Sequence, residues 1–455
     1  MKIHILSLGC ARTLVDSEGL GGLLAAEGHA IADKPERADC VVVNTCAFIR
    51  EAEEESVSTI LDLAALKKAG KIRHLVVAGC LPQKRKGERE DLLAHLPEVD
   101  GFIGPGDLPK LPALIREWNR PAAAPADRFF VTSPVPTLIF DAKTPKHRLT
   151  PKHFAFLKVS EGCDHACAFC SIPQYRGPHR SRSIEDLTAE AERLASEGVV
   201  ELNLIGQDSS YYGMDRYGKL ALPDLLTALG RVRGIRWVRI LYAHPAHVTD
   251  ELVRAIRETP NVVPYIDIPI QHIADRILTR MKRETDGARI RAIVAQLRRE
   301  IPGIAIRTTF IAGFPGETEG EVDQLAAFLR EARFERVGIF PYRVEPKTAA
   351  EKMTDGVPER TIQKRLDRLM TLQREISREN NAAWVGRTVE VLVEEPGGEP
   401  GLFLGRTRSD APEVDGQVFL HGPRNLKPGR FVEARVTGAE EYDLTAETLP
   451  ASVSS

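Results

Sequence analysis

The chain lacks both a long hydrophobic run and a strong net charge of either sign. No apolar stretch approaches the roughly 20 residues that a membrane-spanning helix needs. The 455 residues carry a formal net charge of −2, with 43% hydrophobic and 28% charged residues. This balance excludes a global attraction to nucleic acid, so a charged partner must be met by a local surface. A chain of this length is too long for one compact core, and roughly two to four domains are expected.

The N-terminus also lacks the features of a secretory signal. Residues 6–10 (LSLGC) superficially resemble a lipoprotein cleavage site, but the apolar stretch before the cysteine covers only residues 3–8 and contains His4. A secretory hydrophobic region needs roughly 7–15 apolar residues. We therefore expect a first β-strand here and a cytoplasmic protein. The seven cysteines of such a protein indicate metal or redox chemistry rather than disulfides.

Three cysteines stand close together without a fourth. Cys163, Cys167 and Cys170 follow one another at spacings of four and three residues. A structural zinc site closes four ligands around its metal, and an electron-transfer 4Fe–4S cluster usually takes four thiolates. Three cysteines leave one iron of a cubane open to a substrate, which indicates an enzyme. The alternative is a short zinc loop that uses His165, but a ligand inside the first gap would reach the same metal only under strain.

Regions with different patterns follow one another along the chain. Residues 1–118 alternate strand-like and helical segments, which predicts an α/β domain with a doubly wound parallel sheet. Residues 119–150 are rich in proline and are interpreted as a linker. The alternation resumes over 151–378, where six β/α repeats fit a partial barrel. Short strand-like segments over 381–449 predict a small antiparallel β-barrel.

The strands expected in the two α/β regions are 3–8, 40–43, 75–78, 154–159, 200–205, 237–242, 264–268, 304–310 and 336–340. Those expected in the C-terminal region are 387–394, 402–407, 417–420 and 431–437. Ligands of parallel α/β folds bind at the carboxyl ends of the strands. Cys163 follows the first strand of the barrel by a few residues, so we expect the three-cysteine loop at that end.

Cys10, Cys46 and Cys80 are far apart in sequence but share a context, because each directly follows an apolar strand-like segment. The carboxyl ends of parallel strands lie at one edge of a sheet, so these thiols could converge there on an inorganic group. The alternative is three ordinary buried cysteines, since free cysteine is among the most buried residue types. Cys40 lies inside its strand and is interpreted as a core thiol.

The C-x3-C-x2-C spacing, with Phe169 before its last cysteine, resembles the radical S-adenosylmethionine superfamily. The resemblance implies that Cys163, Cys167 and Cys170 hold a 4Fe–4S cluster and that the open iron binds S-adenosylmethionine. It further implies that one electron from the cluster cleaves this cofactor and releases a 5′-deoxyadenosyl radical.

Taken with Cys10, Cys46 and Cys80, the whole chain is similar to the methylthiotransferase family. This similarity implies a second 4Fe–4S cluster on those three cysteines, which carries the sulfur destined for the substrate. It also implies that the small C-terminal barrel is a TRAM domain of the OB-like kind. All six cysteines are then expected to be both metal ligands and part of the catalytic machinery.

Within that family the chain is most similar to the ribosomal-protein type, the RimO type. The segments that carry this similarity are 15–18 (VDSE), 44–49 (NTCAFI), 205–208 (IGQD), 265–272 (YIDIPIQH) and 410–416 (DAPEVDG). The implied reaction adds a methylthio group to the β-carbon of an aspartate in small-subunit ribosomal protein twelve. The resemblance also implies an electron donor such as flavodoxin, a monomeric state and no membrane partner. Methylthiolation of an N6-modified adenosine of tRNA is the alternative.

Further candidate residues follow the expected barrel strands. By resemblance, Gly206, Gln207 and Asp208 bind the methionyl ammonium of S-adenosylmethionine, although a turn capped by Asp208 explains the same residues. Phe169 lies against the adenine or in the core. Gly313 belongs to a GFPGE segment that resembles a glycine motif near the adenine, and a tight strand-to-helix turn is the alternative.

Other polar groups allow two interpretations each. His272 faces the cavity or is a satisfied polar residue. Arg176 and the basic run 84–86 guide an anionic partner, hold the cofactor carboxylate or are solvated.

The charge of the C-terminal region bears on the substrate. Residues 381–449 carry twelve acidic and seven basic residues, a net of −5. A domain that binds tRNA should be basic, because neutralisation of phosphate charges dominates nucleic-acid affinity. We therefore expect this domain to attract a lysine-rich ribosomal protein. A different class, a ferredoxin-like electron carrier or metal-binding scaffold, would require fully ligated clusters.

Overall fold

The computed structural model describes residues 1–116, 118 and 128–450. The chain forms two compact units. The first comprises Met1–Leu149, Lys158–His165 and Cys170–Arg182, and the second comprises Thr150–Leu157, Ala166–Phe169 and Ser183–Ser455. Part of the segment interpreted as a linker, residues 119–127, lies outside the described residues.

The first unit is built on a six-stranded parallel sheet with the order β2-β1-β3-β4-β5-β6. Its strands are β1 (Lys2–Ser7), β2 (Ala30–Ile31), β3 (Cys40–Thr45), β4 (His74–Gly79), β5 (Gly101–Ile103) and β6 (Phe129–Val131). β1, β3 and β4 correspond to the three strands expected from the sequence. β6 lies within the expected linker and pairs with β5, so that part of the segment belongs to the sheet.

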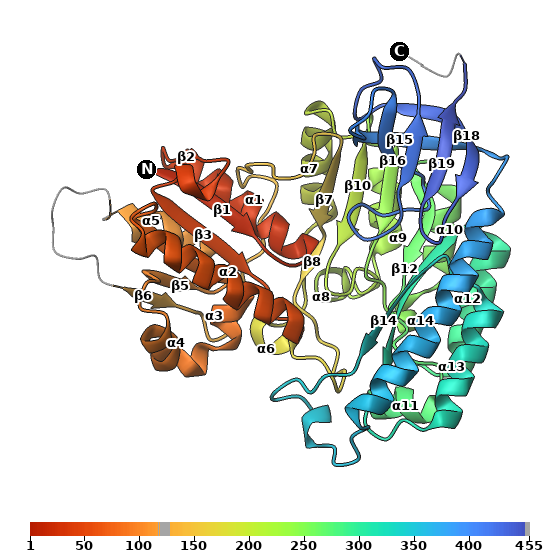
Figure 1. The fold of residues 1–455 in the computed structure, drawn as a ribbon, viewed down its shortest axis with the longest axis horizontal. Coiled ribbons are helices and arrows are strands. Elements are labelled where there is room, and N and C mark those ends of the chain that lie inside the picture. Colours follow the sequence, from red (N-terminus) through yellow and green to blue (C-terminus); the bar gives the residue numbers. More distant parts are fainter. Residues whose placement is uncertain (117, 119–127, 451–455) are drawn as a thin grey trace. The chain divides into compact units, whose positions relative to one another are not determined.

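Helices cover both faces of this sheet, as a doubly wound fold requires (Figure 1). On one face, α1 (Ala11–Ala26) and α5 (Leu111–Arg116) pack against alternate residues of β3 such as Val42. On the other face, α2 (Arg50–Lys68) and α4 (Arg89–His95) pack against Val41 and Val43. The unit also contains α3 (Cys80–Lys84), α6 (Ile172–Arg176) and the antiparallel pair β8 (Ser160–Glu161) and β9 (Arg180–Ser181).

The second unit contains a six-stranded sheet with the order β14-β13-β12-β11-β10-β7. Its strands are β7 (Phe154–Lys158), β10 (Glu201–Ile205), β11 (Trp237–Ile240), β12 (Val262–Asp267), β13 (Ala305–Ala312) and β14 (Arg336–Pro341). Each corresponds to an expected strand. All residues of β7, β10 and β11 are buried, as in parallel strands covered on both faces. The sheet thus matches the open, partial barrel that the sequence predicts.

The helices of this unit alternate with its strands. They are α7 (Ile184–Ser196), α8 (Met214–Tyr217), α9 (Leu222–Leu229), α10 (Asp250–Glu258), α11 (Asp275–Arg280), α12 (Gly287–Glu300), α13 (Glu319–Ala332) and α14 (Glu359–Ala382). α13 begins at a capping box, in which Thr318 and Glu321 satisfy each other's backbone N–H groups. In the part of the chain that the structure describes, no helix is both long enough and apolar enough to cross a membrane.

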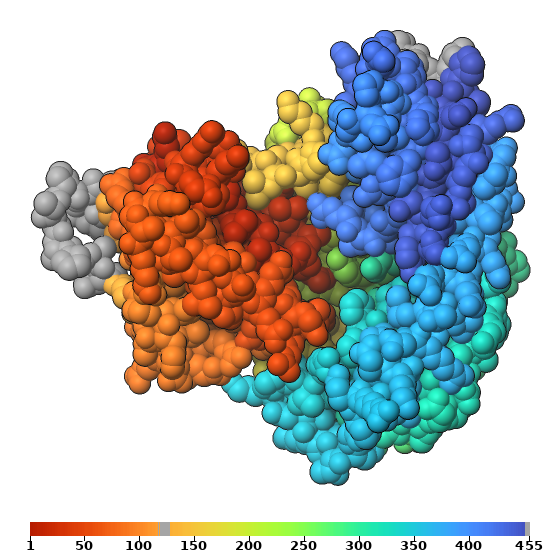
Figure 2. Space-filling view, viewed as in Figure 1, coloured from red at the N-terminus to blue at the C-terminus, as the bar shows by residue number. Residues whose placement is uncertain are grey.

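The C-terminal strands form a closed five-stranded barrel, drawn in blue in Figure 1. They are β15 (Thr388–Pro396), β16 (Leu402–Arg406), β17 (Val418–His421), β18 (Phe431–Ala439) and β19 (Leu444–Thr448). The sequence predicts the first four strands but not β19. β17 and β19 pair in parallel, so the barrel is not antiparallel throughout. In Figure 2 the barrel and the lighter blue α14 form one continuous surface.

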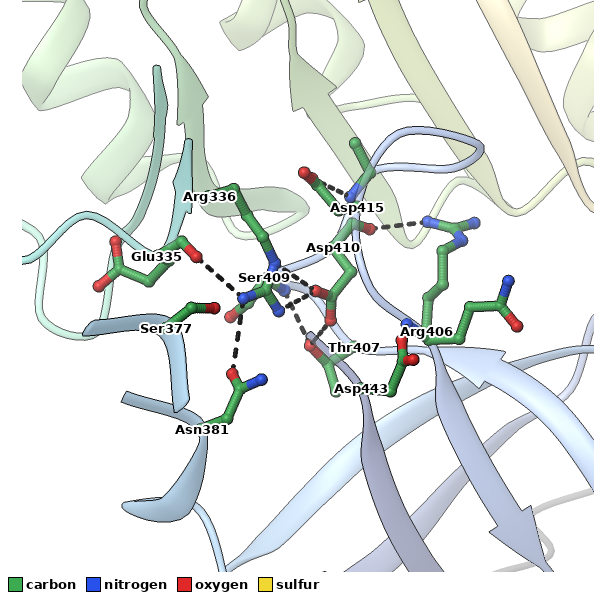
Figure 3. Close-up of polar contacts among 12 residues, drawn as sticks. Glu335, Arg336, Ser377, Asn381, Arg406, Thr407, Ser409, Asp410, Asp415 and Asp443 are labelled. Atoms are coloured by element: carbon green, nitrogen blue, oxygen red, sulfur yellow. Dashed lines mark hydrogen bonds and ion pairs between the residues drawn. The ribbon is translucent and has the colours of Figure 1, made fainter. Parts of the chain in front are cut away.

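A loop of the barrel carries acidic side chains that bind the sheet of the same unit (Figure 3). Asp410 accepts hydrogen bonds from Arg336 at 2.5 Å and from Thr407 at 2.7 Å. Asp415 accepts one from the hydroxyl of Tyr265 at 2.7 Å and lies 3.3 Å from Arg307. The barrel is therefore joined to β12, β13 and β14 by buried polar contacts.

A second buried ionic cluster joins the barrel to β10. Arg406 donates hydrogen bonds to Glu201 and Glu394, both at 2.6 Å, and His153 Nε2 lies 3.2 Å from Glu394 Oε1. Burial favours the neutral form of Glu394, but the hydrogen bonds and charges of His153 and Arg406 outweigh it. Together they lower the pKa of Glu394 to about 2.

The Glu394→Gln variant is expected to be less stable than the wild type at neutral pH by about 1–3 kcal/mol, because Arg406 loses a charged partner. A carboxyl whose pKa is lower in the folded state stabilises above its unfolded pKa of about 4.3 and loses that effect in acid. The difference between the two proteins should therefore shrink as the pH falls from about 5 to about 2.

Urea midpoints followed by tryptophan fluorescence at several pH values measure this difference. Glu447→Gln, which changes an exposed glutamate of the same barrel, serves as the control and should match the wild type. A Glu394→Gln deficit that is equal at all pH values contradicts the account.

Candidate metal centre and cofactor loops

The structure brings Cys10, Cys46 and Cys80 together at one edge of the first sheet. They follow β1, β3 and β4, which are adjacent, and the register places Ser7 beside Asn44 and Thr45 beside Gly79. Each thiol lies within electrostatic range of the others, since the charges of Cys10 and Cys46 act on the pKa of Cys80. The thiols that follow three adjacent strands therefore lie near one another.

Two glycines allow the backbone to pack closely beside these thiols. Gly9 has φ +87°, and a Cβ there would lie 2.4 Å from the Cβ and 2.9 Å from the Sγ of Cys46. Gly79 has φ +94°, and its Cβ would lie 2.3 Å from Asn44 Oδ1. Both backbone conformations favour glycine, and a side chain at either position would overlap the neighbouring strand end. The glycines before Cys10 and Cys80 therefore let the ends of β1, β3 and β4 come close together.

Polar side chains of the neighbouring loops hold the backbone around the thiols. Asn44 Nδ2 donates hydrogen bonds to the Thr13 carbonyl at 3.1 Å and to Ser17 Oγ at 2.9 Å. Thr45 donates to the Ala78 carbonyl at 2.6 Å, which connects the ends of β3 and β4. The sequence shows Asn44 and Thr45 only as part of a motif and does not show these contacts.

The three thiols differ in acidity. Burial raises the pKa of Cys10, but Arg12, the Thr13 N–H and Arg176 outweigh it and lower that pKa to about 6. Burial raises the pKa of Cys80 to about 12 although Arg176 opposes it, and burial together with the charge of Cys10 raises the pKa of Cys46. Metal binding must therefore displace protons from Cys46 and Cys80 at neutral pH.

Cys40 behaves differently, as the sequence predicts. It is 0% exposed within β3, where it packs with apolar residues of the α1 face. Burial raises its pKa. It lies at the start of its strand, whereas the other three thiols follow strand ends, so it is a core thiol.

Arg176 is a charged residue in direct contact with one of these thiols. Its Nη2 donates a hydrogen bond to Cys80 Sγ at 3.0 Å, and its Nη1 donates to Asp16 at 2.8 Å and to Glu161 at 3.3 Å. Lys158 also binds Asp16 and lies 2.7 Å from Glu161. All four charged side chains are buried. Asp16 lies in the 15–18 motif. The sequence does not predict a role for Lys158 and Glu161, which show in it only as two charged residues at the end of an apolar strand.

The basic run 84–86 binds groups of the chain itself. Lys84 donates hydrogen bonds to the Ala47 carbonyl and to Glu53, both at 3.0 Å. Arg85 donates to Glu53 at 2.6 Å, and Lys86 donates to the Pro134 carbonyl at 2.7 Å. These contacts fix α2 beside the loop that follows Cys46, so the run has a structural use.

Cys163, Cys167 and Cys170 lie in the loop between β8 and α6, and all three are half-buried. Cys163 and Cys170 belong to the first unit and Cys167 to the second. The Cys163 N–H donates to the Gly177 carbonyl at 3.1 Å. Arg283 donates a hydrogen bond to Cys167 Sγ at 3.4 Å. His165 is half-buried in the same loop.

Gly206, Gln207 and Asp208 directly follow β10, and Asp208 caps the turn. Its Oδ1 accepts hydrogen bonds from the N–H groups of Ser210 at 2.9 Å and Tyr211 at 3.2 Å, and its Oδ2 lies 2.9 Å from His247 Nδ1. The structure thus shows the capped turn that the sequence offered as the alternative. If Asp208 contacts a cofactor, its carboxylate must either give up these partners or share its oxygens with them.

Gly313 and His272 are linked through one buried glutamate. The Gly313 N–H donates to Glu317 at 2.9 Å, and His272 Nε2 lies 3.3 Å from Glu317 Oε1. Gly313 has φ +84°, and a Cβ there would lie 2.4 Å from Ile362. The turn and its packing account for this glycine. His272 Nδ1 accepts a hydrogen bond from the Ala274 N–H at 3.0 Å, whereas its buried Nε2 makes no hydrogen bond within the described residues, so this histidine is only partly satisfied. Phe169 packs against the apolar cluster that contains Phe314.

Comparisons with known proteins agree with this architecture. Residues 2–104 match the Uncharacterized protein family UPF0004, residues 157–329 the Radical SAM superfamily, and residues 385–449 the TRAM domain. The solved structure of the radical S-adenosylmethionine methyltransferase TsrM from Kitasatospora setae has a TM-score of 0.54 at 14% identity, covering 77% of this chain and 73% of that one. The fold and the three-cysteine loop define a radical S-adenosylmethionine protein, whose cofactors are an iron–sulfur cluster and S-adenosylmethionine.

Full-length relatives give the family. The chain is 46% identical to the ribosomal protein uS12 methylthiotransferase RimO of Opitutus terrae, covering 98% of this chain and 96% of the relative. It is 44% identical to that of Heliobacterium modesticaldum, covering 99% and 95%. The chain belongs to the RimO family of methylthiotransferases.

The Gly79→Ala variant is expected to destabilise the first unit more than Gly70→Ala. Both glycines have positive φ, +94° and +70°, so an alanine at either is strained. The left-handed region costs a residue with a Cβ about 1–2 kcal/mol, and Gly79, with ψ −141°, lies close to a region that is essentially confined to glycine. Nothing lies within 4 Å of a Cβ at Gly70, whereas one at Gly79 would overlap Asn44 and Thr45. Urea unfolding measures the free energy of unfolding of each variant. An equal loss of stability in the two variants would contradict the expected effect of crowding at Gly79.

Proposed function

We propose that the chain transfers a methylthio group to ribosomal protein uS12, at the β-carbon of an aspartate, and that it uses two three-cysteine 4Fe–4S clusters. The convergence of Cys10, Cys46 and Cys80 at one sheet edge is the observation that supports this most. An electron carrier needs no second cluster with only three cysteine ligands. A sulfur-inserting enzyme, in contrast, needs both a radical source and a sulfur donor.

The residues fit the proposed groups. Cys163, Cys167 and Cys170 would hold one cluster, and Cys10, Cys46 and Cys80 the other. When bound, these clusters and S-adenosylmethionine supply radical and sulfur chemistry. Thiolates are the ligands that iron–sulfur clusters take, and free cysteines supply them at both places.

The protein's own groups prepare the second centre for metal. Because its pKa is about 6, Cys10 is a thiolate at neutral pH and can bind first. Cys46 and Cys80 must each release a proton as they bind. Arg176 then balances the charge of the buried Cys80 thiolate, since its guanidinium stays protonated.

For S-adenosylmethionine we propose Gly206 and Gln207 as contacts, with Asp208 acting through the turn that it caps. Phe169 and the Gly313 turn would line the adenine side, since Phe169 and Phe314 belong to one apolar cluster. From the family resemblance we further propose a one-electron donor such as flavodoxin, a monomeric enzyme and a cytoplasmic location. The relatives favour ribosomal protein over the tRNA adenosine as the substrate.

Anaerobic incubation of the reconstituted enzyme with S-adenosylmethionine, dithionite and either uS12 or bulk tRNA tests the proposal. Mass spectrometry should find a methylthio group in place of one aspartate hydrogen of uS12 and no change in tRNA. Modification of tRNA with unchanged uS12 would overturn the choice of substrate.

Two matched cysteine variants test the role of the second centre. Cys46→Ala should give no detectable product, because a ligand of the sulfur-donating cluster is lost. Cys40→Ala changes the same residue type in the core of the same strand and should retain activity close to the wild type. Full activity of Cys46→Ala would refute the proposed sulfur source.

A further inference from the structure

We propose that Arg176 is a positioning residue that sets the reduction potential of the cluster held by Cys10, Cys46 and Cys80. The inference rests on the proposed function, which places a cluster on these thiols. The inference gives Arg176 a role in setting a reduction potential, although this residue is not itself a metal ligand.

The contact between Arg176 and Cys80 carries the inference. Nη2 lies 3.0 Å from Sγ, and the arginine is 5% exposed. A hydrogen bond to a ligand sulfur, together with burial of the site, shifts the potential of an iron–sulfur cluster. A fixed positive charge stabilises the added electron of the reduced form. Arg176 therefore makes the cluster easier to reduce.

A buried network fixes the direction in which Arg176 donates. Nη1 is held by Asp16 at 2.8 Å and by Glu161 at 3.3 Å, which leaves Nη2 for the sulfur. Lys158 binds both carboxylates from the other side. The planar fork of arginine can serve a carboxylate and a sulfur at once, whereas lysine offers only a point charge.

The network is assembled from the elements that surround the thiols. Asp16 lies on α1, the helix that begins after Cys10, while Arg176 ends α6 and Glu161 lies in β8. Asp16 therefore opposes Arg176 electrostatically while it orients the guanidinium. Removing the charge of Asp16 and removing that of Arg176 should move the potential in opposite directions.

A dithionite titration followed by electron paramagnetic resonance tests this on the full-length protein. A parent carrying Cys163→Ala, Cys167→Ala and Cys170→Ala retains only the cluster in question. Reduction adds one electron from dithionite and breaks no bond. Adding Arg176→Gln should make reduction about tenfold less favourable, a negative shift of about 59 mV for one electron.

Three further changes in the same parent separate tuning from damage. Asp16→Asn keeps an oxygen that accepts from Arg176 but removes a negative charge, so the potential should rise. Arg176→Lys keeps the charge and should shift the potential less than Arg176→Gln. Arg37→Gln, which removes an exposed arginine that pairs with Asp33 in the same unit, should give no shift.

The outcomes separate this inference from the proposed function. The role of Arg176 would be overturned if the reduction potential shifted in the same direction in Arg176→Gln and Asp16→Asn, or if it shifted in neither variant. If Arg176→Gln fails to hold a cluster, the other two variants test the role of Arg176. The reduction potential should then fall in Arg176→Lys and rise in Asp16→Asn. A parent that binds no cluster at all instead refutes the proposed function, and the inference with it.

Discussion

Parallel pairing of β1, β3 and β4 is the constraint on which the candidate metal centre depends. Because adjacent parallel strands end at one edge, three cysteines from distant parts of the chain reach the same place. The strand ends can approach one another closely because Gly9 and Gly79 carry no side chain where one would overlap Cys46 and Asn44. The hydrogen bond of Thr45 to the Ala78 carbonyl joins the ends of two of these strands.

The sequence predicts much of this architecture because strands in parallel sheets are short apolar runs. All nine strands expected in the two sheets are present, and so is the edge position of Cys10, Cys46 and Cys80. The sequence does not predict β2, β5, β6, β8 and β9, because each has only two or three residues, nor β19 (LTAET), because it contains few apolar residues. The Arg176 network could not be predicted, because its four charges come from separate segments and their pairing exists only in the folded chain.

The structure also changes the meaning of the acidic C-terminal barrel. Several of its carboxylates bind arginines that lie outside residues 381–449, so they do not act on an external partner. These pairs are Glu390 with Arg236, Asp410 with Arg336, Asp415 with Arg307 and Glu441 with Arg378. The net charge of −5 therefore overstates the negative field of the barrel. Membership of the RimO family is the stronger argument for a ribosomal-protein substrate.

The central claim is that six cysteines form two separate three-thiol cluster sites. Iron and sulfide counts after anaerobic reconstitution test it most directly, with the full-length wild type beside two triple alanine variants. The wild type should bind about eight irons per chain, and replacement of Cys10, Cys46 and Cys80, or of Cys163, Cys167 and Cys170, should leave about four. A wild type with about four irons, or a Cys10, Cys46 and Cys80 variant that keeps the full wild-type count, would contradict the account.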